Sequence, residues 1–435
     1  MSDSKYSFVV AIMTVGGLIG SLAAAYFSDR YGRRGSLFGI NVLMGIGSLV
    51  MALAVAPEGM MVGRFIVGLG IGSVTVIVPA YISECVPTSS RGFFGALVQL
   101  ITCIGIMATQ VIGLYWSTLS RWRYIFGMGI LLAVAQIGLL LFCVDSPRYL
   151  ASLSDGFESA KASLLRLRNC SEIEAEEEIN EWRRDWANHA VSSASSDADN
   201  NNTESQQQHH VNTFTFITNP AFRKALFLVF LVQFTQQFSG INAVIFYSTS
   251  IMSTIFPNSS GMITVYISVV NIVFTGLSAY LMDKAGRRTL FLLSTASMTV
   301  TAFLLGWSIE HKQDVISVIA ILGYVATFAL GLGPIPFLMV PELVDTPAVS
   351  SACSISLATN MISNFLVSAG FLSLRNLMGQ GQVFYLFGLF LILLFAVSYL
   401  VLPETKNREV EEIIRSNYTI YPVHYHTLPN DEEEE

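Results

Sequence analysis

Long apolar segments alternate with short polar turns along almost the whole chain. Each segment holds about 20 residues, enough for an α-helix to cross the roughly 30 Å hydrocarbon layer of a bilayer. Polar residues gather between the segments and in one longer stretch near the middle of the chain. The pattern predicts an all-α membrane protein with about eleven transmembrane helices, over residues 8–27, 37–56, 62–83, 93–114, 124–144, 222–247, 262–282, 289–308, 315–340, 351–373 and 383–402.

Composition points to the same class of protein. Hydrophobic residues make up 52% of the 435 residues and charged residues 13%, with a mean hydropathy of +0.56. Soluble domains carry about 25% charged residues. The net charge of −7 comes largely from the central polar stretch and the acidic run at 431–435. This acidity argues against nucleic acid and against anionic lipid as partners, and leaves the lipid bilayer as the surroundings of the chain.

Cysteine and histidine add no metal or redox chemistry to this prediction. The five cysteines include no CxxC pair and no metal-ligand spacing, and all six histidines lie outside the apolar segments. We therefore expect no metal, no cofactor and no intramembrane histidine proton relay.

A short polar sequence occurs twice, as Ser-Asp-Arg-Tyr-Gly-Arg-Arg at 28–34 and Met-Asp-Lys-Ala-Gly-Arg-Arg at 282–288. Each copy lies between two apolar segments, so the chain consists of two related halves. Such internal repeats are typical of transporters in which two helix bundles move about a central site. Two segments precede the second copy within its half, but only one precedes the first copy. The comparison predicts that one helix is missing at the front.

The bias of lysine and arginine among the short loops places both repeats in the cytosol. We expect an N-terminal bundle over 1–144, a cytoplasmic loop over 145–219, a C-terminal bundle over 220–402 and a cytoplasmic acidic tail over 403–435. The sequon at Asn258 then lies outside, where it is a candidate for glycosylation. Plasma membrane and vacuolar membrane both fit this topology.

The central loop divides into two parts of different composition. Residues 158–186 are charged and compatible with a helix, which either bridges the two halves or is only a solvated helix. Residues 192–210 are rich in Ser, Asn and Gln, a composition that predicts disorder.

The repeated Gly-Arg-Arg turn has acidic partners in both halves. A glycine permits a tight reversal, and the arginines can reach carboxylates or helix ends on neighbouring segments. Glu84, together with Arg91, follows one segment of the first half, and Glu342 has the corresponding place in the second half. We predict a cytoplasmic gate formed by these charges; alternatively the arginines serve only to orient the helices.

Amide side chains lie at membrane depth within otherwise apolar segments. Uncharged amides are costly in lipid unless they face a partner or a wet cavity. Amides both donate and accept hydrogen bonds, as sugar hydroxyls do, so they suit a neutral polyhydroxylated ligand; bonds between helices are the alternative. The sequence Gly-Leu-Gly-Pro-Ile-Pro at 331–336 lies inside an apolar segment, and its prolines predict a bend in that helix. The bend either lies beside a cavity or moving gate or is a passive kink. The amides are Gln99, Gln110, Gln233, Gln236, Gln237, Asn242, Asn271, Asn360 and Asn364.

Together these motifs resemble the sugar porter family of the major facilitator superfamily, over nearly the whole chain. The matching residues are Asp-Arg-Tyr-Gly-Arg-Arg at 29–34, Gly-Arg-Phe at 63–65, Pro-Ala-Tyr-Ile-Ser-Glu at 79–84, Arg-Gly at 91–92, Ser-Pro-Arg-Tyr-Leu at 146–150, Gln-Gln-Phe-Ser-Gly-Ile-Asn at 236–242, Gly-Pro-Ile-Pro at 333–336 and Pro-Glu-Thr-Lys at 403–406. The resemblance implies two pseudo-symmetric six-helix bundles, here without the first helix, and alternating access around a hexose site at the midplane.

The resemblance also assigns roles to individual residues. It implies a substrate site at Gln99, Gln236, Gln237, Asn242, Asn271, Phe337 and Asn364, and a cytoplasmic gate at Arg33, Glu84, Arg91, Arg148, Arg287 and Glu342. These roles are binding and gating, with no covalent chemistry, so we expect a transporter and not an enzyme.

The chain departs from the family pattern at several places. Ala329 stands where many relatives have a sugar-binding glutamate, Phe337 and Met361 where tryptophan is common, Val144-Asp145 in place of Pro-Glu and Val349 in place of a loop arginine. In proton-coupled relatives, the first helix supplies an aspartate near the arginine that matches Arg64.

We therefore predict transport of a hexose or related neutral polyol, as uniport or coupled to protons. The lack of Asp or Glu at hydrocarbon depth favours uniport. The alternatives are a non-transporting sugar sensor or trafficking protein with the same fold, and an inactive truncated product.

Overall fold

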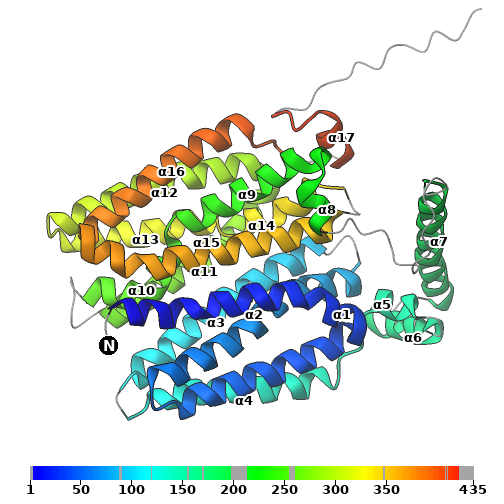
Figure 1. Cartoon of the computed structure of the whole chain (residues 1–435), viewed down its shortest axis with the longest axis horizontal. Coiled ribbons are helices and arrows are strands. Elements are labelled where there is room, and N and C mark those ends of the chain that lie inside the picture. Colours follow the sequence, from blue (N-terminus) through cyan, green and yellow to red (C-terminus); the bar gives the residue numbers. More distant parts are fainter. Residues whose placement is uncertain are drawn as a thin grey trace, which may run out of the picture.

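The computed structural model describes residues 3–87, 91–118, 120–153, 156–168, 171–196, 213–253, 260–345, 348–406, 408 and 410–420, and the secondary structure of this part is helical (Figure 1). The membrane-depth helices are α1 (Asp3–Leu53), α2 (Pro57–Cys85), α3 (Arg91–Trp116), α4 (Trp122–Leu140), α9 (Arg223–Phe238), α10 (Ile241–Ser253), α11 (Ser260–Ala285), α12 (Arg287–Glu310), α13 (Asp314–Leu330), α14 (Ile335–Met339), α15 (Val349–Met378) and α16 (Gln380–Val401). The shorter elements are α5 (Pro147–Ser152), α6 (Phe157–Arg168), α7 (Glu172–Ser196), α8 (Thr213–Thr218), η2 (Pro220–Phe222), η3 (Val340–Glu342) and α17 (Val410–Arg415).

The first helix doubles back on itself. A straight helix of 51 residues would be about 75 Å long, far more than a bilayer crossing. Its backbone leaves helical geometry at Gly32, where φ is 77° and ψ is 170°, and the two parts then run side by side (Figure 1). Ten helices of the described residues are long and apolar enough to cross a membrane. With α1 counted as two, they match the eleven segments expected from the sequence; the missing first helix stays a prediction.

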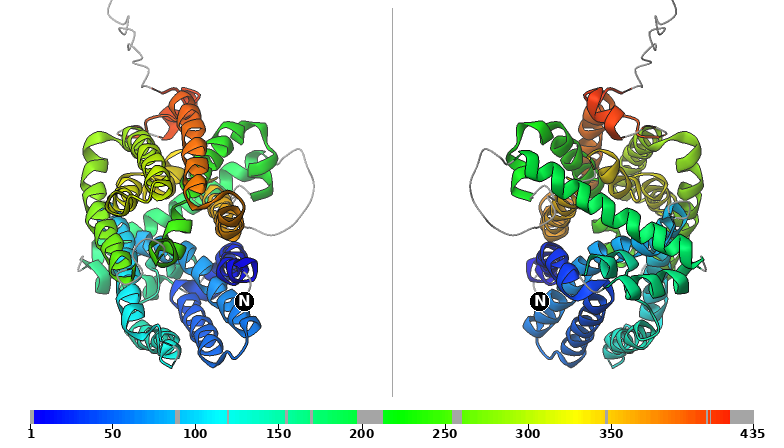
Figure 2. Two further views of the ribbon diagram at one scale, coloured as in Figure 1. Left: turned by 90° about the vertical axis from the view of Figure 1, so that its left-hand side faces the viewer. Right: turned by 90° about the vertical axis from the view of Figure 1, so that its right-hand side faces the viewer.

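The helices form two groups that lie against each other (Figures 1 and 2). One group contains α1 to α4 and the other contains α9 to α16, within the ranges expected for the two bundles. The first part of α1 packs on α15, and α3 packs on α11, so these two contacts join the halves. The largest buried apolar cluster belongs almost entirely to the second half and includes Tyr247, Tyr324 and Phe371.

Helices α5, α6 and α7 form a small unit at one end of the bundle, with α7 lying across the direction of the spans (Figures 1 and 2). Ala160, Leu164 and Ile179 are its buried core. Lys161 bridges Glu176 at 2.6 Å and Glu172 at 3.0 Å, and these bonds raise the pKa of the lysine.

The prediction of disorder over 192–210 is wrong for residues 192–196, which continue α7, because five residues of tolerable helix propensity can extend an existing helix. The remainder of that range lies outside the described residues.

The C-terminal segment folds back on the second half. Tyr418 donates a hydrogen bond to the carbonyl of Leu343 at 3.0 Å and contacts two apolar clusters. Burial, together with Asp345, raises the pKa of Tyr418 to about 12. The acidic run expected in the tail lies outside the described residues.

Candidate functional site

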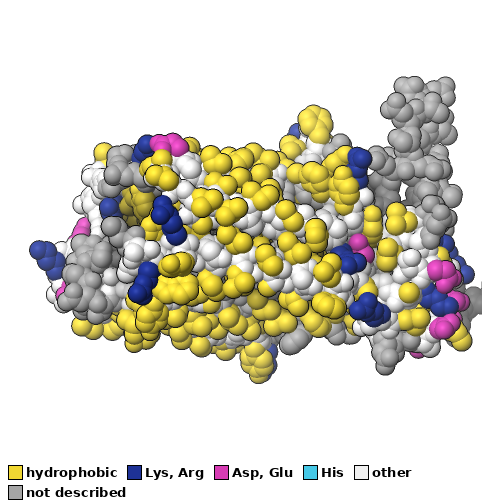
Figure 3. Space-filling model, turned by 90° about the horizontal axis from the view of Figure 1, so that it is seen from below, with side chains coloured by type: hydrophobic (Ala, Val, Ile, Leu, Met, Phe, Trp, Pro, Cys, Tyr) yellow, Lys and Arg dark blue, Asp and Glu magenta, His cyan; other side chains and the backbone are white. Residues whose placement is uncertain are grey.

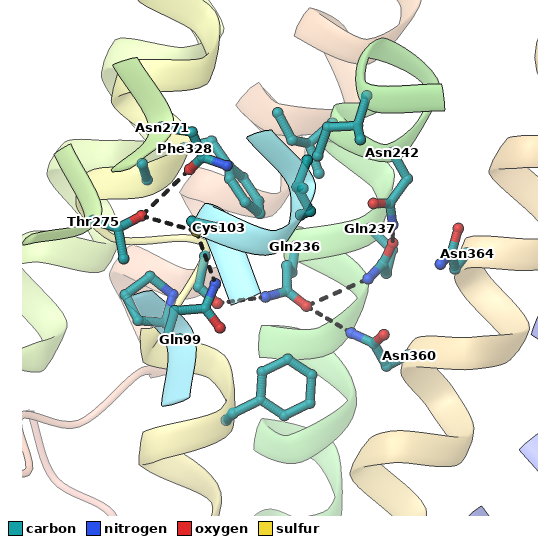
Figure 4. A pocket seen from close by; sticks show the side chains of 17 residues that line it. Gln99, Cys103, Gln236, Gln237, Asn242, Asn271, Thr275, Phe328, Asn360 and Asn364 are labelled. Carbon is teal, nitrogen blue, oxygen red and sulfur yellow. Dashed lines mark hydrogen bonds between the residues drawn. The ribbon is translucent and has the colours of Figure 1, made fainter. Parts of the chain in front are cut away.

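A polar cavity of about 220 Å³ lies between the two halves (Figure 4). Helix α3 of the first half contributes three lining residues and the second half contributes the others. The lining contains no Asp, Glu, Lys, Arg or His among the described residues. It consists of Gln99, Cys103, Ile106, Gln236, Gln237, Ile241, Asn242, Ile245, Asn271, Thr275, Phe328, Ala329, Gly333, Pro334, Phe337, Asn360 and Asn364.

Two breaks in the helices shape the cavity. Helix α9 ends before Gly240, whose φ of +81° suits a glycine, and α10 begins directly afterwards. A Cβ at this position would approach the ring of Phe387 to 2.4 Å. The second break follows α13 and frees the carbonyls of Leu332 and Gly333. Backbone groups released at membrane depth need new partners.

Gln236 supplies those partners. Its amide nitrogen donates to the carbonyl of Leu332 at 2.9 Å and to that of Gly333 at 2.8 Å. Its oxygen accepts from Asn360 at 2.6 Å and from Gln237 at 3.4 Å. Both ends of this side chain are therefore engaged, and Gln236 holds the broken segment against α9.

Further amide bonds extend this network across α9, α10 and α15. Asn360 also donates to the oxygen of Gln233 at 2.7 Å, and Gln233 donates to Ser356 at 2.6 Å. Asn242 donates to the oxygen of Gln237. Gln236, Gln237 and Asn360 are each only 4% exposed. Most amides of the second half are thus fixed in orientation before any ligand arrives.

A second chain of contacts crosses the cavity between the halves (Figure 4). Gln99 donates to the sulfur of Cys103 at 3.8 Å, and this sulfur lies 3.7 Å from the hydroxyl of Thr275. Thr275 in turn donates to the oxygen of Asn271 at 3.3 Å. Since thiols form weak hydrogen bonds, Gln99 keeps most of its bonding capacity.

All seven residues of the predicted substrate site line this cavity. Asn364 accepts from Ser368 at 2.9 Å, which leaves its amide nitrogen available to a ligand within the described residues. Phe337 is 41% exposed and presents an aromatic face.

Two polar residues of the lining, Cys103 and Thr275, were not predicted from the sequence. Each lies four residues after a predicted contact, on the same helical face, and this spacing could have identified them.

At the end of the molecule expected to face the cytosol, the repeated turns have the same geometry in both halves. Gly32 and Gly286 have φ of +77° and +89°. In the first half, Asp145 Oδ1 accepts from the backbone N–H groups of Arg33 at 3.0 Å and Arg34 at 3.2 Å.

Glu404 has the corresponding place in the second half. Its Oε1 atom accepts from the backbone N–H groups of Arg287 at 2.9 Å and Arg288 at 3.4 Å. Sequence analysis assigned no role to Asp145 or Glu404, because neither acid belongs to the repeated turn.

The first arginine of each turn pairs with the predicted acid of its own half. Arg33 Nη2 lies 2.9 Å from Glu84 Oε1, and Arg287 Nε lies 3.4 Å from Glu342 Oε1. Thr405 donates to the other oxygen of Glu342. Within the described side chains, these ion pairs form inside each half and do not join the two halves.

Three predicted residues do not enter these clusters. Arg148 is exposed on α5, and the part of the chain that the structure describes gives it no ion pair. Arg91 opens α3, but its side chain is outside the described part, and Asn258 lies outside the described residues.

Comparison with known proteins agrees with the fold. Residues 1–416 match the family model "Sugar (and other) transporter". The chain is 37% identical over 420 residues to the facilitated glucose transporter member 3 of solute carrier family 2 from Gallus gallus, covering 95% of this chain and 81% of the relative. It is 32% identical to a probable metabolite transport protein of Saccharomyces cerevisiae, covering 96% of this chain and 83% of that protein.

Solved structures share the architecture. The inward open conformation of the xylose transporter XylE from E. coli superposes with a TM-score of 0.78 at 23% identity, covering 96% of this chain and 89% of that one. The proton:xylose symporter XylE bound to 6-bromo-6-deoxy-D-glucose gives 0.75 at 23% identity, with 96% and 91% covered. The likeness shows the major facilitator fold, and together with the family match it establishes that the chain belongs to the sugar transporter family.

Proposed function

We propose that the chain carries a neutral hexose or related polyol by uniport, through alternating access to the cavity between its halves. The observation that carries this proposal is the charge-free, amide-rich lining. Gln99, Asn271 and Asn364 offer amide groups to hydroxyls, and Phe337 offers an apolar face on which a sugar ring can pack. No covalent step is required, so the protein acts as a carrier and not as an enzyme.

Within this proposal the amides have two different tasks. Gln236 and Asn360 are bonded to other parts of the protein, so they shape the cavity and position its wall. Gln99 and Asn364 have remaining bonding capacity, so they contact the sugar directly. Gln237, Asn242 and Asn271 complete the ring of polar groups.

We assign the two cytoplasmic charge clusters to gating. Each ion pair holds the turn of its own half in a fixed shape, so the halves can move as rigid bodies. Loss of Arg33 or Glu84 leaves a partly buried charge without its partner, which is more costly than loss of an exposed pair.

Counterflow of labelled glucose into proteoliposomes tests the proposed substrate class. We expect saturable uptake that unlabelled hexoses suppress and charged sugars such as glucuronate do not. Asn364→Ala should raise the half-saturation concentration about fivefold, as the loss of one hydrogen bond of about 1 kcal/mol predicts. Gln110→Ala is the matched control, because Gln110 lies outside the cavity lining and bonds Ser268. Equal loss in both variants would contradict the proposed site.

The described residues that line the cavity include no carboxylate and no histidine, which predicts weak pH dependence of uptake. Carboxylates near their ordinary pKa and histidine titrate below or near neutrality. We expect the initial rate of glucose uptake to change by less than about twofold between about pH 6 and about pH 8. Uptake against a glucose gradient, driven by an imposed proton gradient, would contradict uniport.

A further inference from the structure

A second hollow, of about 250 Å³, lies outside the sugar cavity, between the second part of α1 and the end of α4. We call it the α1–α4 groove, lined by Tyr31, Arg34, Gly35, Phe38, Leu140, Leu141 and Asp145. Tyr31, Phe38 and Leu141 are 57%, 42% and 63% exposed. The groove is therefore largely apolar, open to the surroundings of the helices, and basic at one side.

The pseudo-symmetry of the chain shows what the groove lacks. In the second half, Arg288 donates to the carbonyls of Leu402 and Tyr399, both at 2.8 Å, and its guanidinium lies over the Tyr399 ring at 5.4 Å. The ring covers the cation, which is only 9% exposed. Tyr399 stands five residues before the acid Glu404.

The first half has a leucine at the corresponding position. Leu140 stands five residues before the acid Asp145. Arg34 donates to the carbonyls of Leu140 at 2.8 Å and Leu141 at 3.2 Å, as Arg288 does in its half. No aromatic ring at position 140 covers this guanidinium, and the space beside it is the groove.

The side chains around the groove are mainly positive, although the net charge of the whole chain is −7. Arg30 is exposed and lies on the other side of the break at Gly32 from Arg34; it donates to the Tyr26 hydroxyl at 2.9 Å and lies over the ring of the groove residue Tyr31 at 5.7 Å. Arg166 of the adjoining unit donates to the carbonyl of Phe142 at 3.0 Å. Asp145 opposes these cations, but three backbone N–H groups, including that of Ser146 at 2.8 Å, share its Oδ1 atom.

The position of the groove relative to the bilayer indicates its occupant. Figure 3 shows the face that carries α4, with a broad hydrophobic surface bounded by Lys and Arg side chains at its ends. Phosphates of anionic lipids lie at such a boundary, and basic side chains there attract them. An acyl chain can follow Phe38 and Leu141 while the phosphate meets Arg34 and Arg30.

We propose that the α1–α4 groove binds one anionic phospholipid, with its phosphate at Arg34 and Arg30 and an acyl chain along Phe38 and Leu141. The lipid takes the place that the Tyr399 ring has in the second half. This local site coexists with the net charge of −7, because that charge lies mainly in the loop and the tail.

Leu140→Tyr tests the proposal, because it places in the groove the side chain that the second half has at Tyr399. Purified protein in neutral detergent is heated with and without phosphatidic acid, and we expect the lipid to raise the melting temperature by a few degrees. Leu140→Tyr should lose more than half of this rise. Leu139→Tyr is the control, because Leu139 is 67% exposed on α4 but does not line the groove, and it should keep the full rise.

A second pair of variants keeps the test decisive if Leu140→Tyr folds poorly. Gly35→Leu fills the groove from α1, where a Cβ meets only Tyr31 at 3.6 Å, and should also lose the rise. Gly39→Leu, one turn later in open space, should keep it. An unchanged rise in Leu140→Tyr or Gly35→Leu, or the same rise with glycerol 3-phosphate or with phosphatidylcholine, would overturn the proposal.

Discussion

The two halves of the molecule are nearly identical at the repeated Gly-Arg-Arg turns and very different around the cavity. At the turns, each half combines a left-handed glycine, two arginines and one acid whose oxygen accepts from the backbone of both arginines. Among the described residues around the cavity, the first half contributes Gln99, Cys103 and Ile106 and the second half contributes the others. In the most apolar stretch of Leu97–Trp116, which belongs to α3, 6% of the residues are buried inside the protein. In the corresponding stretch of Pro220–Tyr247, which contains α9, the share is 72%.

This difference separates two requirements of the proposed transport by two moving halves. The turn geometry depends on backbone N–H groups and one carboxylate, so it tolerates much change in the surrounding sequence. The cavity depends on side-chain amides fixed by one another, and the structure concentrates these in the second half. We infer that the second half provides most of the contacts to the sugar and that the first half completes the site through Gln99.

The largest expected effect comes from breaking the turn glycines. Gly32→Ala would place a Cβ 2.4 Å from Asp145 Oδ2, and Gly286→Ala one 2.5 Å from Glu404 Oε2. Both glycines also have backbone angles that other residues rarely adopt, φ 77° and ψ 170° at Gly32 and φ 89° and ψ 160° at Gly286, and this adds about 1–3 kcal/mol to the clash. We expect each variant to lower the melting temperature by several degrees. Gly39→Ala is the control, since a Cβ there meets nothing within 4 Å.

If the two turns are equivalent, Gly32→Ala and Gly286→Ala should lower the melting temperature by amounts that agree within a few degrees. A lower melting temperature in only one of the two variants would show that the two turns do not contribute equally to stability.

Substitutions of the acids Asp145 and Glu404 test the same comparison between the two turns. Neutral Asp145→Asn and Glu404→Gln weaken hydrogen bonds from several backbone N–H groups, each of which is worth about 1.5–3 kcal/mol when the acceptor is charged. Denaturation of the purified protein should show a lower free energy of unfolding for both Asp145→Asn and Glu404→Gln. Asp145→Glu and Glu404→Asp keep the charge and should recover part of the stability. Neutral variants as stable as the native protein would contradict the role of the carboxylates.

A smaller effect is expected at the sulfur contact that joins the halves. Cys103→Ser replaces the sulfur, which lies 3.8 Å from Gln99 and 3.7 Å from Thr275, with a hydroxyl on a shorter bond; once these two side chains move closer to the oxygen, the hydroxyl forms stronger hydrogen bonds than the thiol does. We expect slower turnover with little change in the half-saturation concentration, because the stronger contacts oppose separation of the halves. Cys103→Ala, which removes the contacts, should not slow turnover. Slowing in both variants would indicate a packing role instead.

Sequence analysis could predict the helices, the two halves and the cavity residues for a physical reason. Amides such as Asn271 and Asn364 are conspicuous in apolar segments because lipid cannot satisfy them. Glu84 and Glu342 were candidate partners of the repeated arginines because they have matching positions in the two halves, and in the structure they lie 2.9 Å from Arg33 and 3.4 Å from Arg287.

Other features could not be predicted because they depend on packing between distant segments. The acids Asp145 and Glu404 approach the turns only after α4 and α16 fold back, and nothing in their local sequence indicates the contact. The turn alone does not say whether Arg33 pairs within its half or across to the other. The division of the amides into bonded ones such as Gln236 and available ones such as Gln99 likewise requires the folded cavity.

The most direct test of the account measures glucose counterflow for one amide variant from each half, Gln99→Ala and Asn364→Ala, beside the native chain and Gln110→Ala. The account predicts that both cavity variants raise the half-saturation concentration, Asn364→Ala by about fivefold, while Gln110→Ala does not. Saturable uptake unaffected by either cavity variant would contradict a sugar site shared between the two halves.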